Sequence, residues 1–117
     1  MRNPVEFDAI YLCRSPVDMR MWIDGLAAIV EGQLKLDPFG RYLFAFTNRC
    51  RDKIKCLYWD MTGFACWYKR LEREVFTWPD STDECVSITA QQLSWLLDGY
   101  DIRKMKPHEP LKFQAIS

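Results

Sequence analysis

The sequence is short of histidine and has no pattern that would bring metal ligands together. It contains one histidine, His108, and no C-x-x-C pair among its five cysteines. Structural zinc needs four close ligands, so buried, unreactive thiols are the simpler interpretation of the cysteines. A Cys or Ser nucleophile needs an orienting base, and His108 between Pro107 and Pro110 is poorly placed to be one. We expect no metal, no cofactor and no nucleophilic catalysis.

Long apolar runs are also lacking. No stretch approaches the roughly 18 apolar residues of a membrane span, and no charged-then-apolar leader opens the sequence. The odd number of scattered cysteines argues against a disulfide framework and suits a reducing compartment. A chain of 117 residues without repeats fits one domain. We expect a soluble, cytoplasmic protein with a single domain over residues 1–117, an ordered core at about 9–102 and a loosely attached tail at 103–117.

The sequence has no excess of positive or negative side chains, but these side chains are unevenly distributed. The chain has 16 basic and 16 acidic side chains, for a net charge of zero. Residues 41–73 hold eight basic and three acidic residues, so this segment carries +5. Strong nucleic-acid binders are usually basic overall. The pattern therefore indicates a local basic patch on a neutral protein.

Aromatic and apolar runs predict a set of short strands. Residues 9–13, 42–47, 53–59, 64–71 and 75–78 have the composition of strands. Asp60 and Gly63 suit a turn between the third and fourth runs, because Asp can bond the turn backbone and Gly can adopt a positive φ. The runs from 42 to 71 predict an antiparallel meander. Pro79 ends the last run, since it cannot donate to a ladder.

Two helices flank the meander in the sequence. The first is predicted over 15–34, with either Ser15 at the N-cap and Asp18 closing a capping box, or Asp18 itself as the N-cap. The apolar residues of this segment recur at the spacing of one buried helix face. They are Met19, Trp22, Ile23, Leu26, Val30 and Leu34. Helices beside an antiparallel sheet make an α+β domain. We predict a sheet of about four to five antiparallel strands with two amphipathic helices packed on one face.

The second helix has clear signals at both ends. Thr89 and Gln92 predict a capping box, and Ile88 and Leu93 a hydrophobic staple. Gly99 suits the C-terminal cap. The predicted buried stripe consists of Leu93, Leu96, Leu97 and Tyr100.

The clustered positive charge lies on the predicted hairpin. The candidate nucleic-acid-binding residues are Arg49, Arg51, Lys53 and Lys55, which alternate at the entry to one strand, and Lys69, Arg70 and Arg73 on its neighbour. Interleaved Trp59, Trp67 and Tyr68 complete a surface that can follow a phosphate backbone and stack bases. The alternative is a solvated outer face whose edge lysines deter aggregation. Both interpretations stay open on the residues alone.

Asp60 raises a separate, catalytic hypothesis. It follows a hydrophobic strand, where a nuclease or transposase core would place a metal-binding acid. Such cores need two or three carboxylates converging on paired Mg²⁺ ions, and the spacing of Asp18, Asp24 and Glu72 does not make them converge on Asp60. A turn-bonding role before Thr62 and Gly63 is the simpler interpretation.

Several ordered motifs resemble a known family. They are residues 18–30 (DMRMWIDGLAAIV), 37–72 (DPFGRYLFAFTNRCRDKIKCLYWDMTGFACWYKRLE), 76–79 (FTWP) and 88–101 (ITAQQLSWLLDGYD). Together they resemble the small accessory protein encoded by the second reading frame of bacterial insertion sequences of family 66, called TnpB in that family. Met21, Trp22, Cys50 and Glu74 depart from the family pattern, and Cys50 and Glu74 lower the local positive charge.

The resemblance implies a non-catalytic accessory role in DNA transposition. In such elements a separate transposase carries the catalytic acids and another small protein carries a helix-turn-helix, so both are expected partners, together with DNA at the element ends. The resemblance supplies no active site to carry over. The alternatives are a protein-interaction module that binds the transposase without meeting DNA, and an enzyme that uses Asp60.

Overall fold

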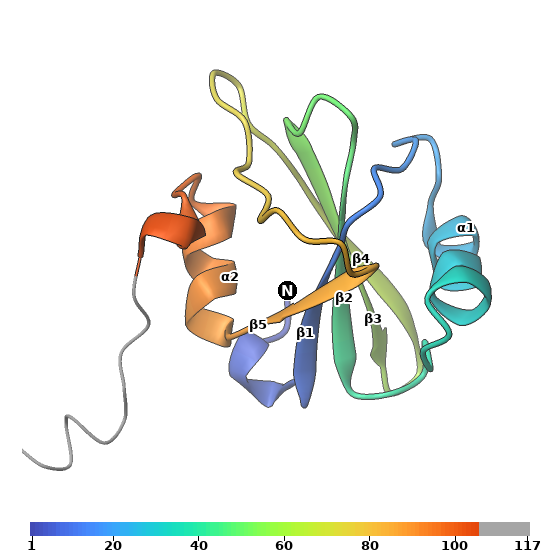
Figure 1. The fold of residues 1–117 in the computed structure, drawn as a ribbon. Helices are drawn as coiled ribbons and strands as arrows, with labels where there is room; N and C mark the ends of the chain where they lie inside the picture. Colours follow the sequence, from blue (N-terminus) through green and yellow to red (C-terminus); the bar gives the residue numbers. More distant parts are fainter. Residues whose placement is uncertain (106–117) are drawn as a thin grey trace, which may run out of the picture.

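The structure, a computed structural model, describes residues 1–105. Its centre is a five-stranded sheet in the order β4-β3-β2-β1-β5 (Figure 1). The strands are β1 (Ala9–Cys13), β2 (Tyr42–Thr47), β3 (Lys53–Asp60), β4 (Gly63–Arg70) and β5 (Cys85–Ile88). The helices are α1 (Ile23–Ala28), its π-helical continuation η2 (Ile29–Gln33), α2 (Ala90–Leu97), and the short 3-10 turns η1 (Pro4–Glu6) and η3 (Ile102–Lys104). The predicted α+β class is confirmed.

The β2–β3–β4 meander forms where the sequence predicts it. Thr47 pairs with Ile54 across the first connection, and Asp60 pairs with Gly63 across the second, so both neighbours of β3 run antiparallel to it. The turn itself differs in one detail. Met61, with φ 53°, takes the left-handed conformation expected of Gly63, which instead begins β4.

The sheet is mixed, because β1 and β2 are parallel. A parallel pair requires a crossover connection, usually a helix, and the segment with α1 and η2 supplies it. β5 then pairs antiparallel with the other edge of β1. The expectation of a wholly antiparallel sheet is corrected at this one strand pair.

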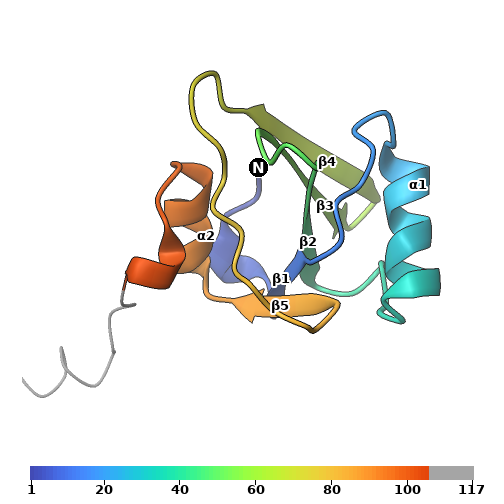
Figure 2. The ribbon, with the colours of Figure 1, turned by 45° about the horizontal axis from the view of Figure 1, so that its top comes forward.

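The two helices lie on opposite faces of the sheet, and not on one face as predicted (Figures 1 and 2). Successive side chains of β2 point to opposite faces, so this one strand packs against both helices. Leu43 and Ala45 join the hydrophobic cluster that contains α2, whereas Phe44 and Phe46 join the cluster that contains Leu26 of α1. Because both faces of β2 are covered, its run is continuously apolar.

The first helix begins later than predicted. α1 starts at Ile23, with Trp22 at the N-cap position and no side-chain cap. The Asp18 carboxylate does not cap a helix, because it accepts hydrogen bonds from the backbone and guanidinium of Arg20. Residues 14–22 form instead a loop that crosses the end of the sheet (Figure 1).

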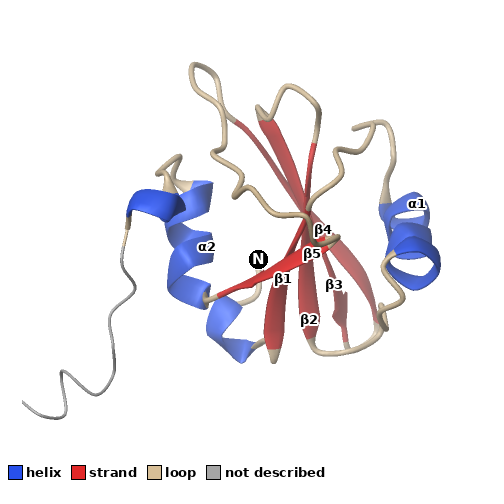
Figure 3. Cartoon of the chain, in the orientation of Figure 1, coloured by secondary structure: helices blue, strands red, loops and turns tan. Residues whose placement is uncertain are grey.

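A long connection joins β4 to β5, and the strand predicted at 75–78 is absent from it (Figure 3). Phe76 and Trp78 are nevertheless buried against the α2 face. The Trp78 indole Nε1 donates to the Cys13 carbonyl at 2.9 Å. This segment therefore closes the core with side chains and adds no strand, and β5 begins at Cys85, where the sequence predicted no strand.

α2 follows its predicted start closely. Thr89 Oγ1 accepts from the Gln92 amide at 3.0 Å, and Gln92 Oε1 accepts from the Thr89 amide at 2.8 Å, which completes the capping box. Gly99 has φ 90° and redirects the chain. Tyr100, predicted to be buried, is consequently exposed. His108 and most of the predicted tail lie outside the described residues.

Candidate nucleic-acid interface

Basic side chains from several segments gather at one end of the sheet. β3 begins there with Lys53, and β4 ends there with Arg70, its direct partner in the ladder. The connections 48–52 and 71–75 lie side by side at this end (Figure 1), and the Leu71 amide donates to the Asp52 carbonyl at 2.8 Å. We call this set of side chains the basic end, and it comprises Arg49, Arg51, Lys53, Arg70 and Arg73.

Two of these cations have acidic neighbours. Lys53 Nζ lies 3.3 Å from Asp52, and the Arg70 guanidinium makes a two-point contact with Glu72 at 2.8 and 3.1 Å. The contact with Arg70 lowers the pKa of Glu72, and a hydrogen bond from Asn48, followed by Lys53, lowers that of Asp52. All four side chains are at least partly exposed. Such pairs are weak, so a phosphate can compete for the cations.

Arg49 and Arg73 differ from them. Both are exposed in the connections, and within residues 1–105 neither forms an ion pair. Arg51 sits in a left-handed turn with φ 59°, and its Nη1 is buried without a hydrogen-bond partner among the described residues. The two exposed arginines are therefore the freest positive charges of the basic end.

Lys55 and Lys69 were also predicted to bind phosphate, but both donate hydrogen bonds to backbone carbonyls of the protein. Lys55 is 5% exposed, and its ammonium donates to the carbonyls of Met19 at 2.6 Å and Met21 at 2.7 Å. Lys69 lies on the opposite face of the sheet and donates to the Leu97 carbonyl at the end of α2 at 2.7 Å. The structure thus divides the predicted continuous surface, and Lys69 is separated from the rest.

The sequence did not predict a groove that lies beside the basic end. It is lined by Asp18, Met19, Arg20, Trp22, Lys53, Lys55 and Tyr68 and has a volume of about 540 Å³. Trp22, predicted to be buried, is 50% exposed, and Tyr68 is 43% exposed. Trp59 and Trp67, predicted as stacking residues, are partly buried. The exposed aromatic residue that lines the groove together with Tyr68 is therefore Trp22.

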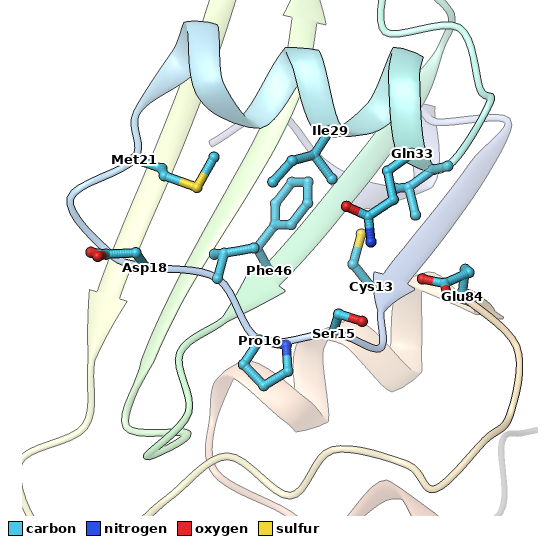
Figure 4. A pocket seen from close by; sticks show the side chains of 11 residues that line it. Cys13, Ser15, Pro16, Asp18, Met21, Ile29, Gln33, Phe46 and Glu84 are labelled. Atoms are coloured by element: carbon cyan, nitrogen blue, oxygen red, sulfur yellow. The ribbon is translucent and has the colours of Figure 1, made fainter.

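A second, smaller cavity of about 250 Å³ separates α1 and η2 from residues 15–18 (Figure 4). Phe46, Met21 and Ile29 provide apolar walls, and the Cys13 thiol faces the cavity. A hydrogen-bonding contact with Cys85, together with burial, raises the pKa of Cys13. A protonated thiol is a poor nucleophile.

Asp60 lies at the β3–β4 turn, where it forms an ion pair with Arg2. Within the described part of the chain, no group of three or more His, Cys, Asp and Glu side chains is arranged to hold a metal ion. Nor does any helix among residues 1–105 have the length and hydropathy needed to cross a bilayer.

Comparison with known proteins identifies the family. Residues 8–107 match the family described as "IS66 Orf2 like protein". The chain is 32% identical over 103 residues to the uncharacterized protein y4jC of Sinorhizobium fredii (strain NBRC 101917 / NGR234), covering 88% of this chain and 87% of the relative. It is 35% identical over 94 residues to y4hO of the same strain, covering 80% and 82% respectively. No solved structure matches the chain. The chain belongs to the IS66 Orf2-like family.

Proposed function

We propose that this protein is a non-catalytic accessory factor for DNA transposition of an insertion sequence, and that it contacts DNA phosphates through the basic end. Membership of the IS66 Orf2-like family supports the accessory role. The catalytic transposase of the element, its other small protein and the element ends are the proposed partners. The proposal assigns phosphate contact to Arg49, Lys53, Arg70 and Arg73.

The convergence of cations at one end of the sheet carries this proposal. Lys53 and Arg70 are cross-strand partners, and Arg49 and Arg73 extend from the two connections that meet beside them. Phosphate contacts fix the position of a protein on a duplex. Arginine suits them, because its planar guanidinium can bond a phosphate at two points. In this proposal Lys55 and Lys69 hold the surrounding segments and do not touch DNA.

The test reverses the charge of Arg49 and Arg73, the exposed arginines that form no ion pair within residues 1–105. The double variant Arg49→Glu/Arg73→Glu should bind duplex DNA at least ten-fold more weakly and keep the melting temperature of the wild type. Arg41→Glu is the matched control, because Arg41 is exposed and lies before β2, at the opposite end of that strand from Asn48. A loss of binding free energy in Arg41→Glu half as large as in the double variant, which reverses twice as many charges, would mean that net charge, and not the basic end, governs binding. Unchanged binding in the double variant would overturn the proposed contact.

A second candidate function rests on a different surface. Met61 is exposed in the β3–β4 turn, and Phe39 is exposed in the connection before β2, where its ring contacts Trp59 at 5.1 Å and Phe64 at 5.3 Å between centroids. Exposed apolar clusters of this kind often mark protein interfaces. On this alternative the protein docks on the transposase and does not contact DNA. Co-purification with the transposase that survives nuclease and high salt, and is lost in Phe39→Ser/Met61→Ser, would favour it.

A further inference from the structure

The groove beside the basic end exposes two aromatic rings around a fixed cation. Lys55 Nζ lies 4.4 Å from the centre of the Trp22 ring and 5.8 Å from the centre of the Tyr68 ring. The two ring centres are therefore within about 10 Å of each other. The rings come from segments far apart in the sequence, one from the loop before α1 and the other from edge strand β4.

The geometry of the groove is held by the fold before any ligand arrives. Lys55 ties the loop to β3 through the Met19 and Met21 carbonyls. The Val17 amide donates to the Thr47 carbonyl at 2.9 Å and fixes the start of the same loop. Trp22 has an extended backbone and precedes the first turn of α1. A preformed site loses less conformational freedom on binding than a flexible one.

Neither packing nor capping accounts for the exposure of Trp22. The residue occupies the N-cap position without making a cap hydrogen bond, and half of its surface remains in water. Aromatic residues contribute most when their large apolar surface is removed from water. An exposed pair at the wall of a groove is therefore a candidate for ligand contact.

The charge around the rings selects the class of ligand. The groove is lined by three basic residues, Arg20, Lys53 and Lys55, and one acidic residue, Asp18, whose carboxylate is engaged by Arg20. A cationic ligand is disfavoured, because the Lys55 ammonium already lies over one face of each ring and would repel a second cation. Flat aromatic faces beside positive charge suit a nucleobase that carries its own phosphate.

We propose that this groove binds an unpaired base of single-stranded DNA, which stacks on Trp22 and Tyr68 while its phosphates reach Lys53 and Arg70. The inference rests on the proposed function, since it specifies the state of the DNA that the same surface contacts. A base within a duplex is stacked on both sides and cannot offer a free face. The site would therefore recognise DNA whose strands have separated, as at a processed or melted element end.

The test compares single strands of equal charge. Wild-type protein is titrated with a short oligo(dT) strand, with a strand of the same length built of abasic linkers, and with duplex. We expect the oligo(dT) strand to bind about ten-fold more tightly than the abasic strand, since stacking on an aromatic side chain contributes about that factor per base. Trp22→Ala and Tyr68→Ala should each remove most of this ratio and leave the affinity for the abasic strand unchanged.

Controls separate stacking from folding and from general binding. Tyr100→Ala removes an exposed aromatic residue after α2, 56% exposed, and should keep the full ratio. Trp22→Phe retains a ring and should keep much of it, even if Trp22→Ala disturbs the loop. Equal binding of oligo(dT) and abasic strands by the wild type would overturn this inference, while salt-dependent duplex binding would leave the proposed function standing. No binding of any strand or duplex at low salt would overturn both.

Discussion

The two faces of the sheet are covered to different extents. The α2 face is closed, because α2 and the segment with Phe76 and Trp78 cover it, and its cluster includes buried residues from β1, β2, β3 and β5. The α1 face is closed only beneath the short helix, around Leu26 and Val30, and stays open beyond it over Lys53 and Tyr68. We infer that the first face supplies most of the stability and that the open part of the second face serves recognition.

The largest effect should come from the closed face. Phe76→Ala removes a fully buried ring and should lower the free energy of unfolding by about 3–5 kcal/mol. Tyr68→Ala, on the open face and in an edge strand, should cost about 1 kcal/mol or less. Denaturant titrations of the two variants measure the difference directly. Similar losses would contradict the division of labour between the faces.

Two lysines on one strand give the next test. Lys55→Met leaves the Met19 and Met21 carbonyls without their donor and should cost about 1–3 kcal/mol. Lys53→Met is the matched control and should cost less than about 0.5 kcal/mol, because its ion pair with Asp52 is partly exposed and weak. Amide exchange across residues 18–22 should accelerate in the Lys55 variant alone. If it does not, the lysine does not anchor the loop.

The two helices differ in how they begin, and this predicts a smaller effect. Thr89→Ala breaks the capping box of α2 and should lower the free energy of unfolding by about 1 kcal/mol. Ser94→Ala, at an exposed site within the same helix, should change it by a few tenths of a kcal/mol at most. A Thr89 variant as stable as the Ser94 variant would show that tertiary packing alone defines this helix end.

The smallest effect concerns pH at the groove. Hydrogen bonds from Arg20 lower the pKa of the exposed Asp18 carboxyl from its usual 3.8 to about 2. A lowered pKa in the folded state stabilises the protein above pH 3.8, and this contribution disappears as the pH falls toward about 2. Titration of Asp18 by NMR measures the shift, and Arg20→Ala should return the pKa to near 3.8. A normal pKa in the wild type would show that the pair does not persist in solution.

The sequence predicts local structure well where the signal is itself local. The apolar runs of β2 and β3, the capping box at Thr89 and the cap at Gly99 were found because each depends on residues a few positions apart. The start of α1 was missed because distant groups decide it. Ser15 and Asp18 match a capping pattern, but Lys55 holds the Met19 and Met21 carbonyls and keeps this segment out of the helix.

The candidate site was only partly predictable for a related reason. Alternation along β3 correctly placed Lys53 and Lys55 on one face, but it cannot reveal that a loop more than 30 residues earlier covers Lys55. Trp22 matches the apolar spacing of the predicted helix, but α1 begins at Ile23. The spacing therefore did not predict that Trp22 is exposed. The position of α1 depends on the parallel β1–β2 crossover, which no local pattern specifies.

The most direct test of the account is the salt dependence of duplex binding by the wild-type protein. If Arg49, Lys53, Arg70 and Arg73 neutralise about four phosphates, log K should fall with log salt at a slope of about −3.6. Replacing Arg49 and Arg73 should reduce the slope by about half. Element ends and scrambled duplex, run side by side, would show whether the contact is specific. A wild-type protein that fails to bind at low salt, or a variant with an unchanged slope, would contradict the central claim.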